Sequence, residues 1–230
     1  MKLHKVLSVN GEPIELISDE SRLDLRSPGR GNFTVKAPAA LRGLVSLDLG
    51  YNSAPLQRHF LGYIERCTQG SAQEQILLCR ELSAVLTLPL PIGLRHVDLN
   101  AVLLEVSRQT GLRFQVPSAP YSKHRTPYFY SLGAGIQALD SLAQVFDIPD
   151  FIWQQQGNGE VYAGNWADSY WGARSALQLP TELFDSYQGN QSAVIAALPG
   201  LRPGATINQG QRITSVTLTG TQMAIQWKRP

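Results

Sequence analysis

The sequence predicts an α+β fold that is mainly β, in which two small antiparallel β-barrel-like domains bracket an α/β insertion. Apolar and polar residues alternate in the first and last parts of the chain, as is typical of half-buried strands. In the middle, apolar residues recur at helical spacing. The 230 residues suffice for one large or two small domains with a buried core. We predict a first β-barrel-like domain at 1–95, the α/β insertion at 96–165, and a linker with a second β-barrel-like domain at 166–230.

Short strands are predicted first, because apolar residues there occupy every second position. Turn residues such as Pro28 and Gly29 separate these strands. The apolar faces consist of Leu23 and Leu25, of Phe33 and Val35, and of Val45, Leu47 and Leu49. We therefore expect antiparallel strands with one buried face each.

A hairpin is predicted next, from two strands at 60–67 and 75–82 joined by the polar connection 68–74. In the simplest register, Cys67 lies near Cys79 across this hairpin. In a reducing cytoplasm two buried thiols are expected rather than a disulfide. We assign the pair no function.

Two amphipathic helices are predicted in the middle of the chain. Asp98 is a good N-cap and Gly111 a good C-terminal stop for the first helix. The second helix follows Gly135 and ends before Pro149. The buried residues of the first are Leu99, Val102, Leu103 and Val106, and those of the second are Ile136, Leu139, Leu142, Ala143 and Phe146.

Strands and loops complete the α/β insertion and the end of the chain. Between the helices we predict a strand at 112–116 and a polar loop at 121–127. A hairpin at 151–155 and 160–163 turns at Gly157-Asn158-Gly159. The last strands are predicted at 206–208, 212–218 and 223–227, where Thr and β-branched residues favour strands.

Composition excludes several classes of protein. The net charge is only +2, so the chain is not a polycationic nucleic-acid binder. Charged residues are 17% and hydrophobic residues 43%, which is low in charge for a freely soluble monomer and favours assembly. The longest uncharged apolar run, 82–93, is too short to cross a membrane. Residues 1–10 lack the apolar core of a signal peptide, so we expect synthesis in the cytoplasm.

Enzyme signatures are weak, and we predict no catalytic, cofactor or metal site. The segment 133–138 fits the G-x-G-x-x-A dinucleotide pattern, but no buried strand precedes it, so its glycines are interpreted as easing entry into a helix. Cys67 and Cys79 lack the companion ligands of a zinc site. His96 near Asp98 could act as a base, but a structural histidine is favoured.

Acidic residues in the second half were considered as paired acids for cutting peptidoglycan. These are Asp140, Asp147 and Asp150. Asp140 lies on the polar side of its helix, and Asp150 follows a proline in a turn, so solvated carboxylates are the better interpretation.

Aromatic residues give the one positive indication of a functional surface. Trp153, Trp166, Tyr170 and Trp171 lie within 19 residues of one another, and the last three fall in a segment with little strand or helix pattern. Such segments bind sugars, stack bases or anchor protein interfaces. With net charge near zero, base stacking lacks its usual electrostatic support. We predict that Trp166, Tyr170 and Trp171 form an interface, with core packing as the alternative.

Several short segments occur in a recognisable order. They are Phe33-Thr34-Val35-Lys36, Leu41-Arg42-Gly43, Leu49-Gly50-Tyr51, 60–65, Arg80-Glu81-Leu82, Thr110-Gly111-Leu112, Asp140-Ser141-Leu142, Ile152-Trp153, Leu201-Arg202-Pro203-Gly204 and 212–216. This order resembles that of phage tail baseplate hub proteins, the late control protein D family, from about Arg22 to Trp227.

The resemblance implies a non-enzymatic structural protein of the virion, located at the tail tip. It implies a homotrimer that connects the tail tube, or a distal tail protein, to the central spike. Two β parts per chain then form a ring of near sixfold symmetry, from which the α/β insertion projects outward. DNA is expected to pass through the lumen without tight binding, because clustered Lys and Arg are not seen in the sequence. No membrane partner is expected.

Two other functions remain open. Residues 97–116 also look like the first helix and strand of a secretin periplasmic N-domain, which would make the chain a cell-envelope binding module. A tail-tip lysozyme or peptidase is the third interpretation, although no constellation of acids or nucleophiles emerges.

Overall fold

A computed structural model describes residues 2–188 and 191–228 of the chain. The chain forms two compact units. Unit 1 comprises Met1–Asp24, Gly29–Glu81 and Ser175–Pro230, and unit 2 comprises Leu25–Pro28 and Leu82–Arg174. The predicted fold class, α+β and mainly β, is confirmed.

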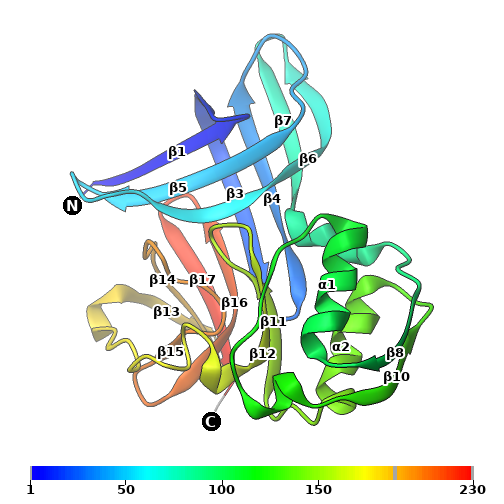
Figure 1. Cartoon of the computed structure of the whole chain (residues 1–230). Coiled ribbons are helices and arrows are strands. Elements are labelled where there is room, and N and C mark those ends of the chain that lie inside the picture. Colours follow the sequence, from blue (N-terminus) through cyan, green and yellow to red (C-terminus); the bar gives the residue numbers. More distant parts are fainter. Residues whose placement is uncertain (1, 189–190, 229–230) are drawn as a thin grey trace. The chain divides into compact units, whose positions relative to one another are not determined.

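Unit 1 is built from strands that belong to one sheet (Figure 1). Its elements are β1 (Leu3–Val9), β2 (Glu12–Ile14), β3 (Leu16–Asp24), β4 (Ser27–Lys36), β5 (Leu44–Tyr51), β6 (Gln57–Ser71), β7 (Glu74–Glu81), η4 (Thr181–Leu183), β13 (Phe184–Gln188), β14 (Ser192–Ala196), β15 (Thr206–Ile207), β16 (Gln211–Thr219) and β17 (Gln222–Lys228). The strand order is β13-β14-β17-β16-β3-β4-β7-β6-β5-β1-β2, and β15 pairs with β16.

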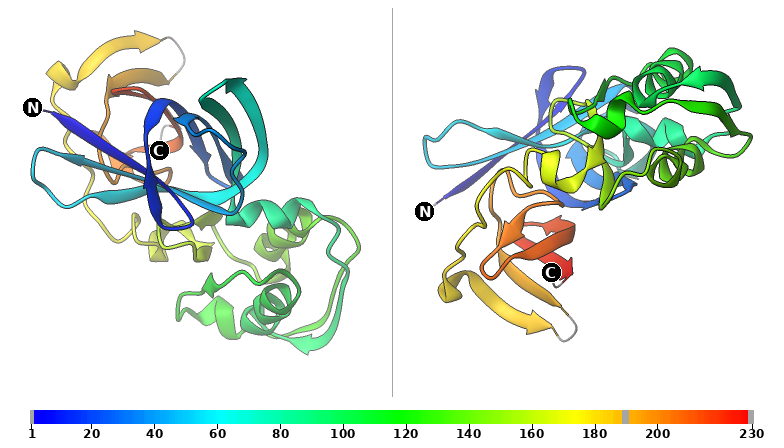
Figure 2. Two further views of the ribbon diagram at one scale, coloured as in Figure 1. Left: turned by 90° about the horizontal axis from the view of Figure 1, so that it is seen from above. Right: turned by 60° about the horizontal axis from the view of Figure 1, so that its bottom comes forward.

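One strand pair joins the two β parts that the sequence places at opposite ends of the chain. β16 runs antiparallel to β3, with Ser215 opposite Asp24 and Thr219 opposite Glu20. The two β parts therefore share a continuous sheet. In both views of Figure 2 the hairpin of β13 and β14 (gold to orange) lies at an end of this sheet, in agreement with the strand order.

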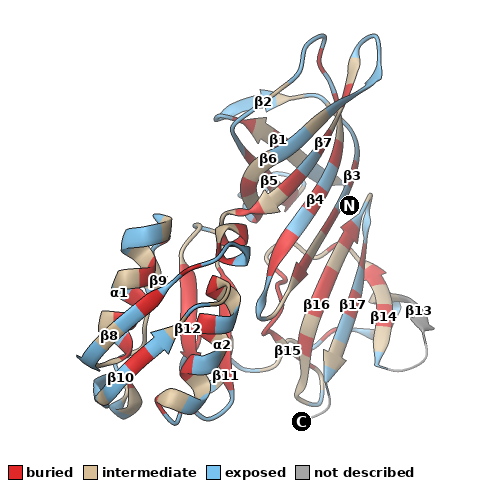
Figure 3. Ribbon diagram, turned by 90° about the vertical axis from the view of Figure 1, so that its right-hand side faces the viewer, coloured by how far each residue is buried: buried red, intermediate tan, exposed pale blue. Residues whose placement is uncertain are grey.

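The sheet buries one face and exposes the other. Phe33 and Val35 on β4 are fully buried, whereas Arg30, Asn32 and Lys36 on the same strand are exposed. Figure 3 shows this alternation as red stripes between blue or tan ones along β4 and β7. The period-two pattern seen in the sequence thus gives the inner face its core, in which the rings of Phe33 and Phe60 lie 5.7 Å apart at 70°.

The hairpin of β6 and β7 is longer than predicted. The pairing continues to Ser71 opposite Glu74, so most of the expected connection 68–74 is strand. Cys67 lies opposite Leu77, and Cys79 lies opposite Ile64. Both cysteines are free thiols.

Unit 2 is the α/β part. Its elements are η1 (Leu82–Thr87), β8 (Ile92–Val97), α1 (Leu99–Thr110), β9 (Phe114–Gln115), η2 (Pro120–Lys123), β10 (Thr126–Ser131), α2 (Gly135–Val145), β11 (Phe151–Gln155), β12 (Val161–Asn165) and η3 (Trp166–Asp168). β8 pairs with β10, and β12 pairs with β11 and, in parallel, with β9.

Both helices lie where the sequence predicts them. The carboxylate of Asp98 accepts the backbone N–H of Ala101 at 2.9 Å and caps α1, and Gly111 ends the helix in the left-handed region at φ 77°. The helix residues predicted to be buried belong to the core of unit 2 or pack against it, and this core also contains Trp153. Residues 82–95, assigned from the sequence to the first β part, lie in unit 2, since Leu86 belongs to that core. The division into three domains stays a prediction.

Two differences concern the strands of unit 2. The strand predicted at 112–116 is limited to β9, and the expected loop 121–127 contains most of η2 and the start of β10. β8 and β10 were missed because their alternation is interrupted by Pro127 and by polar residues.

Candidate functional site

The aromatic residues singled out from the sequence lie in a compact turn at 165–174, which we call the aromatic turn. Asn165 Oδ1 accepts the backbone N–H of Ala167 at 2.9 Å and opens η3. The backbone N–H of Ser169 then donates to the carbonyl of Trp166 at 3.0 Å. A Cβ on Gly172 would lie 2.1 Å from that carbonyl oxygen, so the close approach of the chain here requires glycine.

Two tyrosines of unit 2 hold the start of the aromatic turn. The hydroxyl of Tyr121 donates to Asp168 Oδ2 at 2.8 Å and accepts the backbone N–H of Asn165 at 3.1 Å. The hydroxyl of Tyr162 donates to the carbonyl of Asn165 at 2.6 Å. Burial raises the pKa of Tyr121 to about 12, so it remains a neutral donor at physiological pH. The turn is therefore fixed to the core strands of unit 2.

The structure brings two of the three predicted residues into direct contact. The rings of Tyr170 and Trp171 meet edge to face, with centroids 5.0 Å apart and planes at 85°. The guanidinium of Arg174, which the sequence analysis missed, lies 3.9 Å from the centre of the Tyr170 ring. Tyr170 is half exposed, at 52%. The backbone carbonyl of Trp166 accepts the N–H of Ser169 and so supports the turn.

Trp171 shows an uncommon feature of this turn. Its indole N–H is buried and finds no hydrogen-bond acceptor in the part of the chain that the structure describes. Buried donors are usually paired, and leaving one unpaired costs free energy. Trp153, by contrast, is fully buried in the core and donates to Asp140 Oδ1 at 3.0 Å.

The acidic residues considered for catalysis have structural roles. Asp140 accepts from Trp153 and pairs with Arg26 at 2.9 Å. Asp147 and Asp150 occupy left-handed backbone conformations, φ 51° and 44°, as in turns. Asp98 uses its carboxylate to cap α1.

The glycines of the dinucleotide-like segment serve packing. The backbone N–H of Gly135 donates to the carbonyl of Leu88 at 3.1 Å, so that donor is used within the protein. A Cβ on Gly135 would lie 2.9 to 3.1 Å from atoms of Leu86. Glycine is thus needed where α2 begins against η1.

A buried charged cluster connects the two β parts inside unit 1. Arg202 Nη2 lies 3.2 Å from Glu81 Oε1, and its Nη1 donates to the carbonyl of His59 at 2.6 Å. Glu81 Oε2 also accepts the backbone N–H of Gly29 at 2.7 Å. Burial raises the pKa of Glu81, and burial together with the nearby charge of Arg202 lowers the pKa of His59 to about 3.

The described residues show neither a cluster of metal ligands nor a helix suited to cross a membrane. Within 2–188 and 191–228, no three His, Cys, Asp or Glu side chains gather as metal ligands would. No helix in this part of the chain has the length and apolar character to cross a membrane.

The chain is similar in sequence to a phage protein. No family model matches the chain. It is 29% identical over 220 residues to an uncharacterized 58.7 kDa protein of Haemophilus phage HP1, and the match covers 96% of this chain and 41% of that protein. The chain therefore spans less than half the length of this curated relative.

Solved structures share the fold at low sequence identity. The 43 kDa tail protein of prophage MuSo2 from Shewanella oneidensis has a TM-score of 0.72 at 10% identity, and the match covers 100% of this chain and 97% of that one. A tail protein from Neisseria meningitidis has a TM-score of 0.69 at 9% identity, and this match also covers 100% of this chain and 97% of that one. A type VI secretion system component of E. coli has a TM-score of 0.65 at 16% identity, and the match covers 97% of this chain and 76% of that one. The chain thus has the fold of phage tail proteins and of a related secretion component.

Proposed function

We propose that this chain is a structural, non-enzymatic hub subunit at the tip of a phage tail, related to the late control protein D family. Three copies form a ring that connects the tail tube, or a distal tail protein, to the central spike. The chain is made in the host cytoplasm and becomes part of the virion.

The observation that carries the proposal is the pairing of β16 with β3. It makes one continuous sheet from two β parts, whose order ends at β13 on one side and at β2 on the other. A closed cyclic assembly places the ends of such sheets next to one another, and three chains then contribute six β parts. Support also comes from the match to a phage protein and from the tail proteins that share the fold.

The aromatic turn is proposed as a contact with a neighbouring tail protein. Tyr170 is half exposed and is stacked by Arg174, and Tyr, Trp and Arg are the residues that most often carry interface energy. Because the turn is fixed by Tyr121 and Tyr162, its aromatic rings are presented with little loss of conformational entropy.

Fractionation tests this function. A tagged chain expressed during phage production should copurify with intact virions, and quantitative mass spectrometry should find three copies per tail. Six copies per tail, or export of the chain to the periplasm without virion association, would contradict the proposal. The second result would favour a cell-envelope module.

A further inference from the structure

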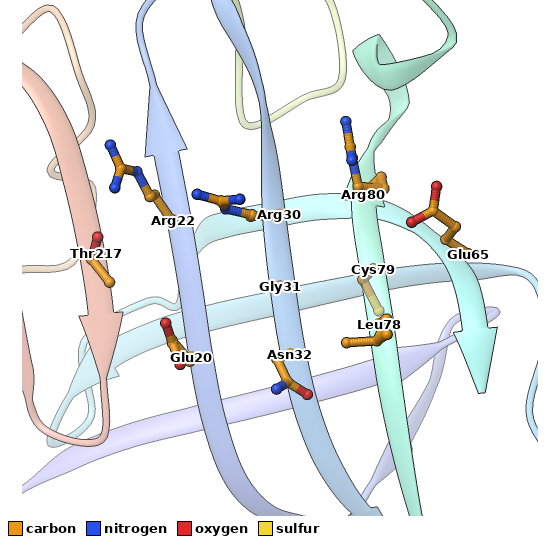
Figure 4. A pocket seen from close by; sticks show the side chains of 10 residues that line it. All are labelled: Glu20, Arg22, Arg30, Gly31, Asn32, Glu65, Leu78, Cys79, Arg80 and Thr217. Atoms are coloured by element: carbon orange, nitrogen blue, oxygen red, sulfur yellow. The ribbon is translucent and has the colours of Figure 1, made fainter. Parts of the chain in front are cut away.

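The exposed face of the unit 1 sheet is hollowed by an open pocket of about 460 Å³, formed by residues of neighbouring strands (Figure 4). Three arginines line it: Arg22 on β3, Arg30 on β4 and Arg80 on β7. In Figure 4 they lie side by side across the strands and on one face of the sheet. The three arginines lie on separate strands, and Arg80 is far from the other two in the sequence, so no basic cluster is visible there.

Two of these arginines face each other directly. Arg30 and Arg80 are register partners in the antiparallel pair of β4 and β7. Side chains at such positions are neighbours, and like charges directly opposite destabilise a sheet. The fold therefore keeps a locally unfavourable pair in the lining of the pocket.

The positive charges of these three arginines are only partly neutralised by carboxylates of the protein. Arg22 is held by Asp24 at 2.9 Å. For Arg30 and Arg80, no carboxylate lies within 4 Å among the described residues. Nε of Arg80 is buried and has no hydrogen-bond acceptor in that same part of the chain. Two guanidinium groups therefore have donors to offer to an anion.

We propose that this pocket binds the carboxylates of an acidic segment of a partner protein. The guanidinium fork matches a carboxylate with two parallel hydrogen bonds. Arg22, Arg30 and Arg80 form an arginine row across three strands. At the usual strand spacing this row is about 10 Å long, which suits a peptide with more than one acidic side chain.

The lining also explains why a peptide fits better than nucleic acid. Glu20 and Glu65 line the same pocket and would repel the continuous negative charge of a DNA backbone. A peptide can place its carboxylates on the arginines and neutral residues beside the glutamates. Asn32, also in the lining, supplies both donors and acceptors for such neutral contacts. This inference uses residues of unit 1 alone and does not depend on the ring.

The test uses the purified full chain and a labelled synthetic ten-residue peptide in which Glu alternates with Ser. Fluorescence anisotropy at low salt should detect binding, and a Gln-Ser peptide should bind at least tenfold more weakly. Arg30→Gln and Arg80→Gln should each weaken binding tenfold or more. Lys36→Gln, on the exposed face of the same strand β4 but outside the pocket, should change it less than twofold.

A second readout guards against simple misfolding. Arg30 is exposed, so Arg30→Gln should leave the fold intact and raise the melting temperature, because it removes the like-charge pair. Absence of binding by the Glu peptide at millimolar concentration would overturn the proposal. So would tighter binding of a DNA oligonucleotide of equal charge that the same substitutions weaken, since the pocket would then be a nucleic-acid site.

Discussion

Arg202 forms a buried ion pair with Glu81, with Nη2 and Oε1 3.2 Å apart and both side chains less than 8% exposed. Glu81 ends β7 of the first β part, whereas Arg202 lies between β14 and β15 of the second. The two residues are 121 positions apart in the sequence. Together with the pairing of β16 and β3, their ion pair therefore holds the two β parts of unit 1 together.

Breaking this pair should be costly. Glu81→Gln or Arg202→Met leaves one buried charge without its partner, and we expect a loss of about 3 to 5 kcal/mol in the free energy of unfolding. Urea denaturation measures this loss. Arg58→Gln, which removes a partly exposed pair with Asp48, is the control and should cost less than about 1 kcal/mol. A loss below 1 kcal/mol for Arg202→Met would show that the cluster does not hold the β parts together.

His59 should make the fold sensitive to acid. Its pKa is lowered to about 3 in the folded chain, from about 6.5 when unfolded. Protons therefore bind the unfolded chain first, and this histidine should reduce stability by about 1.4 kcal/mol per pH unit as pH falls from 6.5 toward 3. Urea melts of the wild type and of His59→Leu, compared from pH 7 to pH 4, should show a steeper decline in the wild type.

The exposed His124 provides the matched control for this pH effect. His124→Gln should follow the wild-type pH profile. Parallel profiles for the wild type and His59→Leu would contradict the expected role of His59.

Glycine 135 should be required for packing rather than for ligand binding. Gly135→Ala places a Cβ about 3 Å from Leu86 and should cost about 1 to 3 kcal/mol, as overpacking of a core does. Gly93→Ala is the control, because a Cβ there meets nothing within 4 Å. Thermal unfolding of both variants measures this difference in stability. Equal melting temperatures would contradict the prediction, because they would show that the start of α2 accommodates the added methyl group without loss of stability.

Trp171 is expected to matter more for assembly than for folding. If the aromatic turn anchors a protein contact, Trp171→Ala should weaken that contact by about 2 kcal/mol or more. Virion incorporation and the melting temperature of the purified chain are measured side by side. Tyr128→Ala, an exposed aromatic elsewhere in unit 2, should leave both unchanged. Normal incorporation of Trp171→Ala would make the segment ordinary surface, and global unfolding would support core packing instead.

Strong local signals predicted much of the fold. Helix α1 follows from Asp98, Gly111 and four apolar residues at helical spacing, all of which act locally along the chain. The Asn10-Gly11 dipeptide is also a local signal of a hairpin turn, although the sequence analysis did not use it. In the structure both residues take positive φ in the turn between β1 and β2.

Long-range relationships could not be predicted in the same way. Nothing local in β3 or β16 indicates that the two strands pair, and nothing local in β6 indicates the bulges that place Cys67 opposite Leu77. The aromatic turn was visible as a group of residues, but its support by Tyr121 and its stacking with Arg174 depend on the tertiary fold. The arginine row is hidden for the same reason, because its members come from three strands.

The most direct test of the central claim is a reconstruction of the phage tail tip by electron cryomicroscopy. We expect three copies of this chain, each contributing its two β parts through the continuous β16–β3 sheet to a ring of six, with the α/β unit outside the ring. A different number of chains in the ring, or β parts of one chain that do not superpose, would contradict the proposed hub.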